Sequence, residues 1–344
     1  MAKNNARKSK RRLNSKKKRT SRKKSIITGL SGLALGAGLY SMYKKAILPK
    51  QGFVFTPAFE EKGMNCLLII DPQKDFMDSG SLPVTGASDD MDRLGDFIEN
   101  NTGKIQSICV TLDTHSLFHI GNKFAYTTTD NKEVDTDKYP ISYDPINYIP
   151  KQGGHVPGLK KHIDSYARKL GEKGGMHMLW PLHCQLGTSG HTIFEPLQTR
   201  LEKWSTKSST EVRYIIKGCD TKYENFSVFR SAGVDKHNYS NPNKEAYKFN
   251  LDLAKHLYQF PNLYIAGEAR THCVFDSTSD YVGWVNSKGN PKKQQIYILW
   301  DCMSDVNVPG QKDTFKLKRE AFEQLIKSNS FMHKIDDAKE ANLS

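Results

Sequence analysis

The sequence predicts a three-layer α/β sandwich, with a mostly parallel central sheet of about six strands and helices on both faces. From residue 64 onward, short β-branched apolar runs alternate with longer amphipathic segments, as in a buried parallel sheet. Polar residues directly follow several runs, at the edge where such sheets collect ligands. The predicted strands are Asn65–Ile70, Ile105–Leu112, Val212–Lys217, Asn262–Ala266, Gln295–Trp300 and Phe331–Ile335. The predicted helices are Ser88–Glu99, Phe194–Glu202, Lys244–Tyr258, Cys273–Val285 and Thr314–Ser328.

The positive charge of the chain is concentrated at its N-terminus. Residues 1–24 hold 13 Lys or Arg and no Asp or Glu, so the remainder of a chain with net charge +14 is close to neutral. One leucine and no aromatic residue in this stretch cannot form a core, and we expect a disordered tail. The tail is a candidate for binding nucleic acid or another anionic surface.

A hydrophobic segment follows at residues 25–43, with 19 uncharged residues that include a Gly32–Gly36 GxxxG pair. As a helix it would be about 28 Å long, enough to cross a bilayer core. Three interpretations stay open: a transmembrane anchor that places the body across the membrane, a nuclear, virion or cytoplasmic nucleic-acid-binding tail with a spacer, and an organelle presequence. Residues 44–63, rich in Pro and Gly, are predicted to be a linker.

The six cysteines show no CxxC spacing and no close pairing. This pattern favours a reducing compartment and cysteines with separate roles over a disulfide framework. It disagrees mildly with an anchor that would export the body of the protein.

Cys273 is the first candidate for chemistry. It follows the predicted strand Asn262–Ala266 and a glycine, where the helix Cys273–Val285 is expected to begin. A thiol at a helix N-terminus is a candidate nucleophile with a lowered pKa. The alternative is a small buried apolar residue, the commonest role of a cysteine without a disulfide.

Two charged residues end other strands of the predicted sheet. Asp71 directly follows the first apolar run, and Lys217 ends the run that begins at Val212. With Cys273 they form a possible set of base, cation and nucleophile at one edge. The alternatives are a turn-capping Asp and a lysine in solvent.

A third set of residues carries the donor atoms that metals prefer. Asp113 and His115 follow the second strand, His119 is close by, and His183 lies in an apolar Pro-containing segment. An Asp-x-His pair alone is a weak indication of a metal site.

Together, these pieces resemble the isochorismatase-like cysteine hydrolase superfamily, and within it the nicotinamidases, over residues 64–336. Several motifs occur in the order of that family. They are Ile69-Ile70-Asp71-Pro72-Gln73-Lys74-Asp75-Phe76, Gly80-Ser81-Leu82-Pro83-Val84, Asp113-Thr114-His115, Trp180-Pro181-Leu182-His183-Cys184, Lys217-Gly218 and Gly267-Glu268-Ala269-Arg270-Thr271-His272-Cys273. Residues 337–344 then form a C-terminal tail.

The resemblance implies a catalytic triad of Asp71, Lys217 and Cys273. It also implies an oxyanion hole made by the backbone N–H groups of Ala269 and Cys273, and a cis peptide bond between Glu268 and Ala269. The implied reaction is a cysteine amidohydrolysis that converts nicotinamide to nicotinate and ammonia through a thioester, as in NAD salvage.

The resemblance further implies that Asp113, His115 and His183 bind a divalent metal, usually Zn²⁺, with Fe²⁺ and Mn²⁺ as alternatives. His119 resembles a further histidine near that metal, as ligand or neighbour. Phe76 and Trp180 are expected to stack against the substrate ring. Their alternative role is that of ordinary core aromatics.

Two departures from the family pattern keep other functions open. Glu268 and Arg270 put charges near the expected oxyanion hole, where they are expected to change the pocket or contact a partner. Residues 121–178 form a long insertion, expected to be a lid or an oligomer contact, whose His155, His162 and His177 are predicted to lie at the surface. The alternatives are a hydrolase for another small amide and a tethered binding module, and self-association is possible in either case.

Overall fold

The computed structural model describes residues 64–135, 139–151, 158–172, 175–232, 249–307, 312–341 and 343. The chain divides into two units, Met1–Lys50 and Gln51–Ser344, and every described residue belongs to the second. The predicted tail, the hydrophobic segment 25–43 and the linker lie outside the described residues. Within the described ranges, no helix is long and apolar enough to cross a membrane.

Six parallel strands form the central sheet, in the order β10-β9-β8-β1-β2-β7. All six predicted strands are confirmed, with small differences at their ends. Their bounds are β1 Asn65–Ile70, β2 Ser107–Asp113, β7 Arg213–Lys217, β8 Asn262–Gly267, β9 Gln295–Leu299 and β10 Met332–Ile335. The central β1 is buried over its whole length, as its continuous apolar run predicts.

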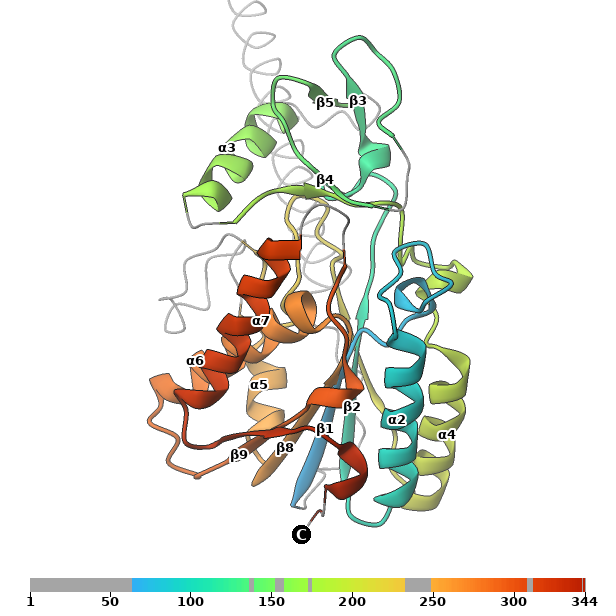
Figure 1. The fold of residues 1–344 in the computed structure, drawn as a ribbon, viewed down its shortest axis with the longest axis vertical. Helices are drawn as coiled ribbons and strands as arrows, with labels where there is room; N and C mark the ends of the chain where they lie inside the picture. The colour runs from blue at the N-terminus through green and yellow to red at the C-terminus, as the bar shows by residue number, and fades with distance from the viewer. Residues whose placement is uncertain are drawn as a thin grey trace, which may run out of the picture. The chain divides into compact units, whose positions relative to one another are not determined.

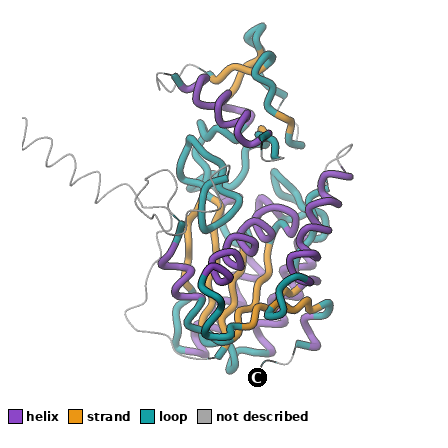
Figure 2. Tube along the Cα trace, turned by 90° about the vertical axis from the view of Figure 1, so that its left-hand side faces the viewer, coloured by secondary structure: helices purple, strands orange, loops and turns teal. Residues whose placement is uncertain are grey.

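Helices cover both faces of the sheet, so the predicted fold class is confirmed (Figures 1 and 2). One face packs against α2 (Ala87–Asn100) and α4 (Glu195–Ser208). The other packs against α5 (Leu251–Leu257), α6 (Phe275–Ser287) and α7 (Lys312–Lys327). In α2 the buried Met91, Leu94, Phe97 and Ile98 recur at helical spacing, which places one apolar stripe on the sheet.

The long insertion forms a small apolar core of its own beyond the carboxyl ends of the strands (Figure 1). Its elements are β3 Tyr126–Thr128, β4 Ile141–Ser142, β5 Tyr148–Pro150, α3 Leu159–Gly171 and β6 Met178–Leu179. The sequence analysis placed no helix there, although α3 carries an apolar stripe.

The predicted surface position of His177 is wrong. This side chain is 3% exposed and packs against the rings of Tyr143 and Tyr166, and burial lowers its pKa to about 4. His162 is half-buried beside Tyr223, and His155 lies outside the described residues.

Gly267, the last residue of β8, allows the chain to turn toward the site. Its φ is +117°, and a Cβ at this position would lie 2.1 Å from the backbone oxygen of Ile70 on β1. Only glycine tolerates both the conformation and the close approach of the neighbouring strand.

We therefore expect Gly267→Ala to lower the free energy of unfolding by about 2 kcal/mol or more, since the backbone of β1 cannot move aside. Urea unfolding measures the change. Gly103→Ala is the matched control, because nothing lies within 4 Å of its added methyl group, and its effect should stay within about 0.5 kcal/mol. Equal effects of the two substitutions would contradict the requirement for glycine at position 267.

Candidate active site

The ammonium group of Lys217 lies at the centre of a buried charged cluster at the carboxyl edge of the sheet. Its Nζ lies 2.8 Å from Asp71 Oδ2 and 2.9 Å from Asp113 Oδ1. The same nitrogen donates to the Asn225 carbonyl at 2.9 Å and lies 3.6 Å from Cys273 Sγ. Burial opposes a charged lysine, but the carboxylates outweigh it and hold the Lys217 pKa well above its usual range. The structure thus brings the three predicted triad residues together.

Asp71 is held rigidly at the end of β1. The Thr111 hydroxyl donates to Asp71 Oδ1 at 2.5 Å and accepts the Asp71 N–H at 3.0 Å. The φ of Asp71 is +46°, in the left-handed region that is costly for a residue with a Cβ. Burial raises the Asp71 pKa, and Lys217 offsets this only in part. A carboxylate whose pKa is raised is a stronger base toward a thiol.

The sequence predicted that Cys273 begins the helix, and this prediction is wrong. It lies in a π-helical turn, Arg270–Val274, and α6 starts after this turn. Burial raises the Cys273 pKa well above its usual range, although Lys217 acts in the opposite direction. The expected lowering of this pKa is therefore wrong, because desolvation of the thiol dominates. A protonated thiol here needs a neighbouring base.

The backbone before Cys273 folds back on itself at the pocket wall. The peptide bond between Glu268 and Ala269 is cis, as predicted. The Ala269 carbonyl accepts the N–H groups of His272 at 3.0 Å and Val274 at 3.2 Å. Ala269 and Cys273, whose N–H groups are the predicted oxyanion donors, both line the pocket.

Asp113, His115 and His183 form a group that could hold a metal ion, with one ligand atom from each lying within 4.8 Å of the others. Asp113 Oδ2 lies 2.8 Å from His115 Nε2 and 3.5 Å from His183 Nε2. All three residues are buried, and His115 Nδ1 has no hydrogen-bond partner among the described residues. Burial lowers the His115 pKa, which favours the neutral imidazole that binds metals.

Neighbouring groups orient these ligands. Pro181 O lies 2.7 Å from His183 Nδ1, so that nitrogen carries the proton and Nε2 keeps its lone pair for the site. The side-chain amide of Gln73 makes two hydrogen bonds with the main chain of Asp113. Its nitrogen donates to the Asp113 carbonyl at 2.8 Å, and its oxygen accepts the Asp113 N–H at 2.7 Å. One carboxylate and two imidazoles held in this way suit Zn²⁺, Fe²⁺ or Mn²⁺.

His119 packs beside this group, with its ring centroid 4.4 Å from that of His115. Its Nε2 lies 3.0 Å from Tyr223 O, and its Nδ1 accepts the Gly121 N–H at 3.1 Å. Both ring nitrogens therefore have protein partners. His119 therefore lies beside the three-ligand group but does not belong to it.

The sequence analysis missed Glu224, a buried carboxyl group on the same pocket wall. Its Oε1 lies 3.6 Å from His119 Nδ1, and burial together with Asp113 raises the Glu224 pKa to about 8. Gly121 provides the space, since a Cβ there would lie 1.4 Å from Glu224 Oε1. Glu224 lies in no quoted motif and does not directly follow a strand, so the sequence carries no signal for it. Gln73 could have been found, because it lies within the first quoted motif.

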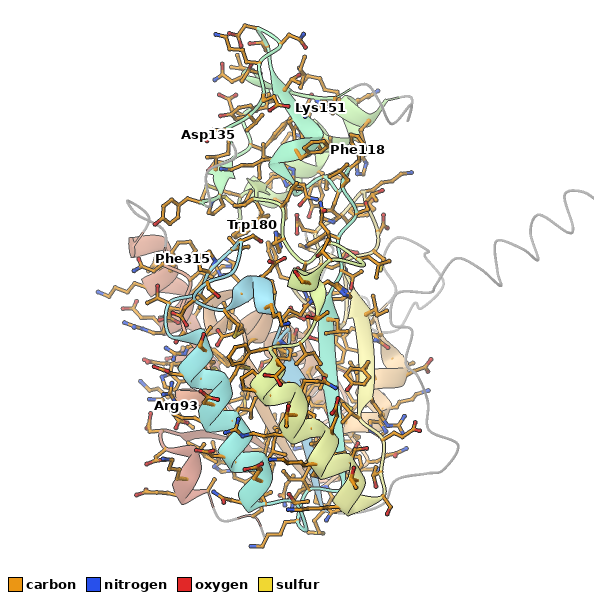
Figure 3. The ribbon with its side chains drawn as sticks, turned by 90° about the vertical axis from the view of Figure 1, so that its right-hand side faces the viewer. Arg93, Phe118, Asp135, Lys151, Trp180 and Phe315 are labelled. Atoms are coloured by element: carbon orange, nitrogen blue, oxygen red, sulfur yellow. The ribbon has the colours of Figure 1, made fainter. Side chains whose placement is uncertain are left out.

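An aromatic pocket is lined by both Cys273 and the three-ligand group and contains about 500 Å³ of empty space, part of it open to solvent. Phe76 and Trp180 line it as predicted, and Figure 3 shows Trp180 where the insertion meets the sheet. The Trp180 ring meets those of Phe226 and His272 edge to face, at centroid distances of 6.0 and 5.6 Å. Such a pocket suits one small flat ring.

Arg270 is not among the described residues that line this pocket. Its guanidinium donates to the carbonyls of Trp300 and Met303 and pairs with Asp305 at 3.3 Å. It also lies 4.5 Å above the Trp300 ring. The expected effect of this charge on the pocket is not seen, because Arg270 instead fastens the loop after β9 to the turn that carries Cys273.

Glu268 also points away from the pocket and is fully buried beside Asp90 of α2. Burial and the neighbouring Asp90 carboxyl raise the Glu268 pKa well above its usual range. The Ser304 N–H donates to Glu268 Oε2 at 3.3 Å, and Arg93 pairs with Asp90. Glu268 therefore serves as a neutral, buried hydrogen-bonding group behind the turn.

Comparisons with known proteins give likenesses to solved structures only. No protein-family model matches the chain, and no curated protein matches it. A nicotinamidase/pyrazinamidase of Acinetobacter baumanii is 16% identical over 82% of this chain and 99% of its own, with a TM-score of 0.49. The yeast nicotinamidase is 19% identical over 79% and 100%, with a TM-score of 0.48. A Pyrococcus horikoshii pyrazinamidase in complex with zinc is 19% identical over 79% and 98%, with a TM-score of 0.42. Because these identities and TM-scores are low, the function proposed below rests on the geometry of the site.

The raised Glu268 pKa makes a prediction about stability and pH. Stability from protonated Glu268 is complete below the ordinary carboxyl pKa of 4.5 and is lost as the pH rises toward the folded-state pKa. Glu268→Gln keeps a neutral group, so its melting temperature should match that of the wild type near pH 4 and exceed it increasingly as the pH rises. At about pH 8 we expect its free energy of unfolding to exceed that of the wild type by more than about 1 kcal/mol.

Glu202→Gln, at an exposed site on α4, is the control and should follow the wild-type curve. Parallel curves for Glu268→Gln and the wild type would show that Glu268 is ionised in the fold, contrary to this account.

Proposed function

We propose that this protein is a metal-dependent cysteine amidohydrolase that converts nicotinamide to nicotinate and ammonia. The observation that carries the proposal is the position of Lys217 Nζ, which contacts Asp71, Asp113 and Cys273 at the base of one aromatic pocket. The thiol of Cys273 thus lines one pocket with the metal-ligating residues, and Lys217 links it to the base Asp71.

The reaction begins with a proton transfer between buried groups. Asp71 accepts the proton of Cys273 Sγ, and the thiolate attacks the carboxamide carbon of the substrate. Lys217 stabilises the negative charge as it passes from carboxylate to sulfur, since its ammonium contacts both partners. The carbonyl oxygen becomes an oxyanion, which the N–H groups of Ala269 and Cys273 stabilise.

The second half of the reaction returns the enzyme to its starting state. The tetrahedral species collapses, the C–N bond breaks, and protonated Asp71 gives its proton to the leaving nitrogen, which departs as ammonia. The remaining thioester links the substrate carbonyl to Cys273. Asp71 then accepts a proton from water, and the resulting hydroxide attacks the thioester. The C–S bond breaks, Asp71 returns its proton to the Cys273 sulfur, and the acid formed leaves as nicotinate after losing its own proton to solvent.

The residues present fit a divalent metal, and Asp113, His115 and His183 would hold it. A metal bound there supplies a Lewis acid for a lone pair of the substrate. Asp113 links this group to the triad, because its Oδ2 faces the histidines while its Oδ1 binds Lys217. The ligand group and the nucleophile are therefore fixed relative to one another.

A pyridine carboxamide matches the arrangement of the pocket. Phe76 and Trp180 offer apolar surfaces to a flat ring, while Cys273 and the three-ligand group line the same pocket. A ring nitrogen directed at the ligand group presents the carboxamide to the thiol. No observation within the described residues favours a different class of substrate.

The first test is ammonia release from nicotinamide by the full chain. We expect Cys273→Ser to lower the rate by about 10³-fold or more, since serine is a far weaker nucleophile in this setting. Cys219→Ser, at an exposed cysteine close to Lys217 in sequence, is the control and should keep the wild-type rate. A folded, metal-loaded protein without release would eliminate nicotinamide and direct the search to other small amides.

The second test removes the metal. Chelation should lower ammonia release, and added Zn²⁺, Fe²⁺ or Mn²⁺ should restore it. His115→Asn should lower both the metal affinity of the Asp113 group and the rate of ammonia release by about 100-fold or more, because it leaves two of three ligands. His162→Asn, outside the pocket, should change neither. Undiminished activity of a demonstrably metal-free protein would contradict the role of the group.

A further inference from the structure

A second group of metal-ligating side chains lies at the opposite end of the same strands. Cys66, Cys109 and His256 each offer one ligand atom, and these atoms lie within 4.8 Å of one another. Asp71 lies five positions after Cys66, which is about 17 Å of extended strand. This group therefore lies well away from the pocket, and nothing in the proposed reaction uses it.

The strand register brings the two thiols together. Cys66 on β1 pairs with Ser107 on β2, and Leu68 pairs with Cys109, so the cysteines are diagonal neighbours on adjacent strands. Side chains alternate along a strand, which places both thiols on the face of the sheet that packs against α5. His256 comes from α5 and reaches the same face. Both cysteines are fully buried, His256 is half-buried, and no disulfide joins the described cysteines.

Polar and charged side chains lie beside the two thiols. Arg213 of β7 pairs with Cys109 in register and is itself buried. Ser107 Oγ lies 3.1 Å from His256 Nε2 and orients the imidazole over the strands. A cluster of polar side chains thus lies on a face of the sheet that is otherwise apolar.

We propose that Cys66, Cys109 and His256 bind a thiophilic divalent metal ion, with Zn²⁺ as the natural ligand, at a site separate from the Asp113 group. Two sulfurs and one nitrogen within 4.8 Å of each other can all reach one ion at the usual distances of about 2.3 Å for sulfur and about 2.0 Å for nitrogen. Two thiolates neutralise a divalent cation, so the buried site carries no net ligand–metal charge.

The chemistry of the donors separates the two sites. Asp113, His115 and His183 offer only oxygen and nitrogen, whereas the second group offers two sulfurs. Softer metals prefer thiolates, and a metal at Cys66 and Cys109 would join β1, β2 and α5. We therefore assign this site a structural role, in which metal binding stabilises the fold.

The test titrates the reduced, metal-free full chain with Co²⁺ under anaerobic conditions. Thiolate ligands to Co²⁺ give an intense near-ultraviolet charge-transfer band, which a site of oxygen and nitrogen ligands does not give. We expect this band in the wild type and in His115→Asn, which disables the first site. Cys273→Ser should also keep it, which excludes the pocket thiol as its source.

Cys109→Ser should abolish the band, and Cys302→Ser, at another buried cysteine, should leave it intact. Because Cys109→Ser could fold poorly, His256→Asn gives a second variant that keeps both thiols and should weaken Co²⁺ binding by about 10-fold or more. Added Zn²⁺ should raise the melting temperature of His115→Asn but not that of His115→Asn/Cys109→Ser.

Absence of the band in the folded wild type would overturn the proposal. So would a band that survives both Cys66→Ser and Cys109→Ser, or one that disappears with Cys273→Ser. A Cys66–Cys109 disulfide that persists after treatment with reductant, detected by mass spectrometry, would also overturn it. None of these outcomes depends on ammonia release, so they leave the proposed function to its own tests.

Discussion

The ion cluster around Lys217 is the interaction on which the rest of the site depends. A buried ammonium is stable only with compensating charge, and Asp71 and Asp113 provide it from the two neighbouring strands, β1 and β2. Removing one partner from a buried ion pair costs about 3–5 kcal/mol, so the three side chains hold one another in place. Cys273 Sγ, 3.6 Å from Lys217 Nζ, is added to an arrangement that is already fixed.

Asp113 extends this order to the histidines. Its two carboxylate oxygens serve different neighbours, Lys217 on one side and the imidazoles of His115 and His183 on the other. Gln73 clamps the backbone of Asp113 from the loop that follows β1. The Asp113 carboxylate therefore couples the protonation of the Lys217–Cys273 pair to the charge on the metal-ligand group. A change of charge in either group alters the electrostatic energy of the other.

The turn that carries Cys273 is supported by Arg270 and Glu268, neither of which is among the described residues that line the pocket. Arg270 binds the carbonyl-rich loop after β9, and Glu268 lies neutral against Asp90 of α2. These contacts join the turn to both neighbouring elements while leaving the pocket wall to Ala269, His272 and Cys273. Arg270 and neutral Glu268 thus hold the backbone of the turn and do not line the pocket.

The sequence by itself determined the six strands, the order of polar residues at their ends and the triad and ligand candidates. The strands follow from local periodicity, and Asp71, Asp113 and Lys217 from their places at the ends of apolar runs. The assignment of His183 and its neighbours as metal ligands came from the resemblance to a known family. Only the tertiary structure decided the directions of Glu268 and Arg270, the burial of His177 and the position of Glu224 under Gly121. It also decided the raised Cys273 pKa and the meeting of Cys66 with Cys109. These features depend on strand register and desolvation, which arise from contacts between residues far apart in the chain.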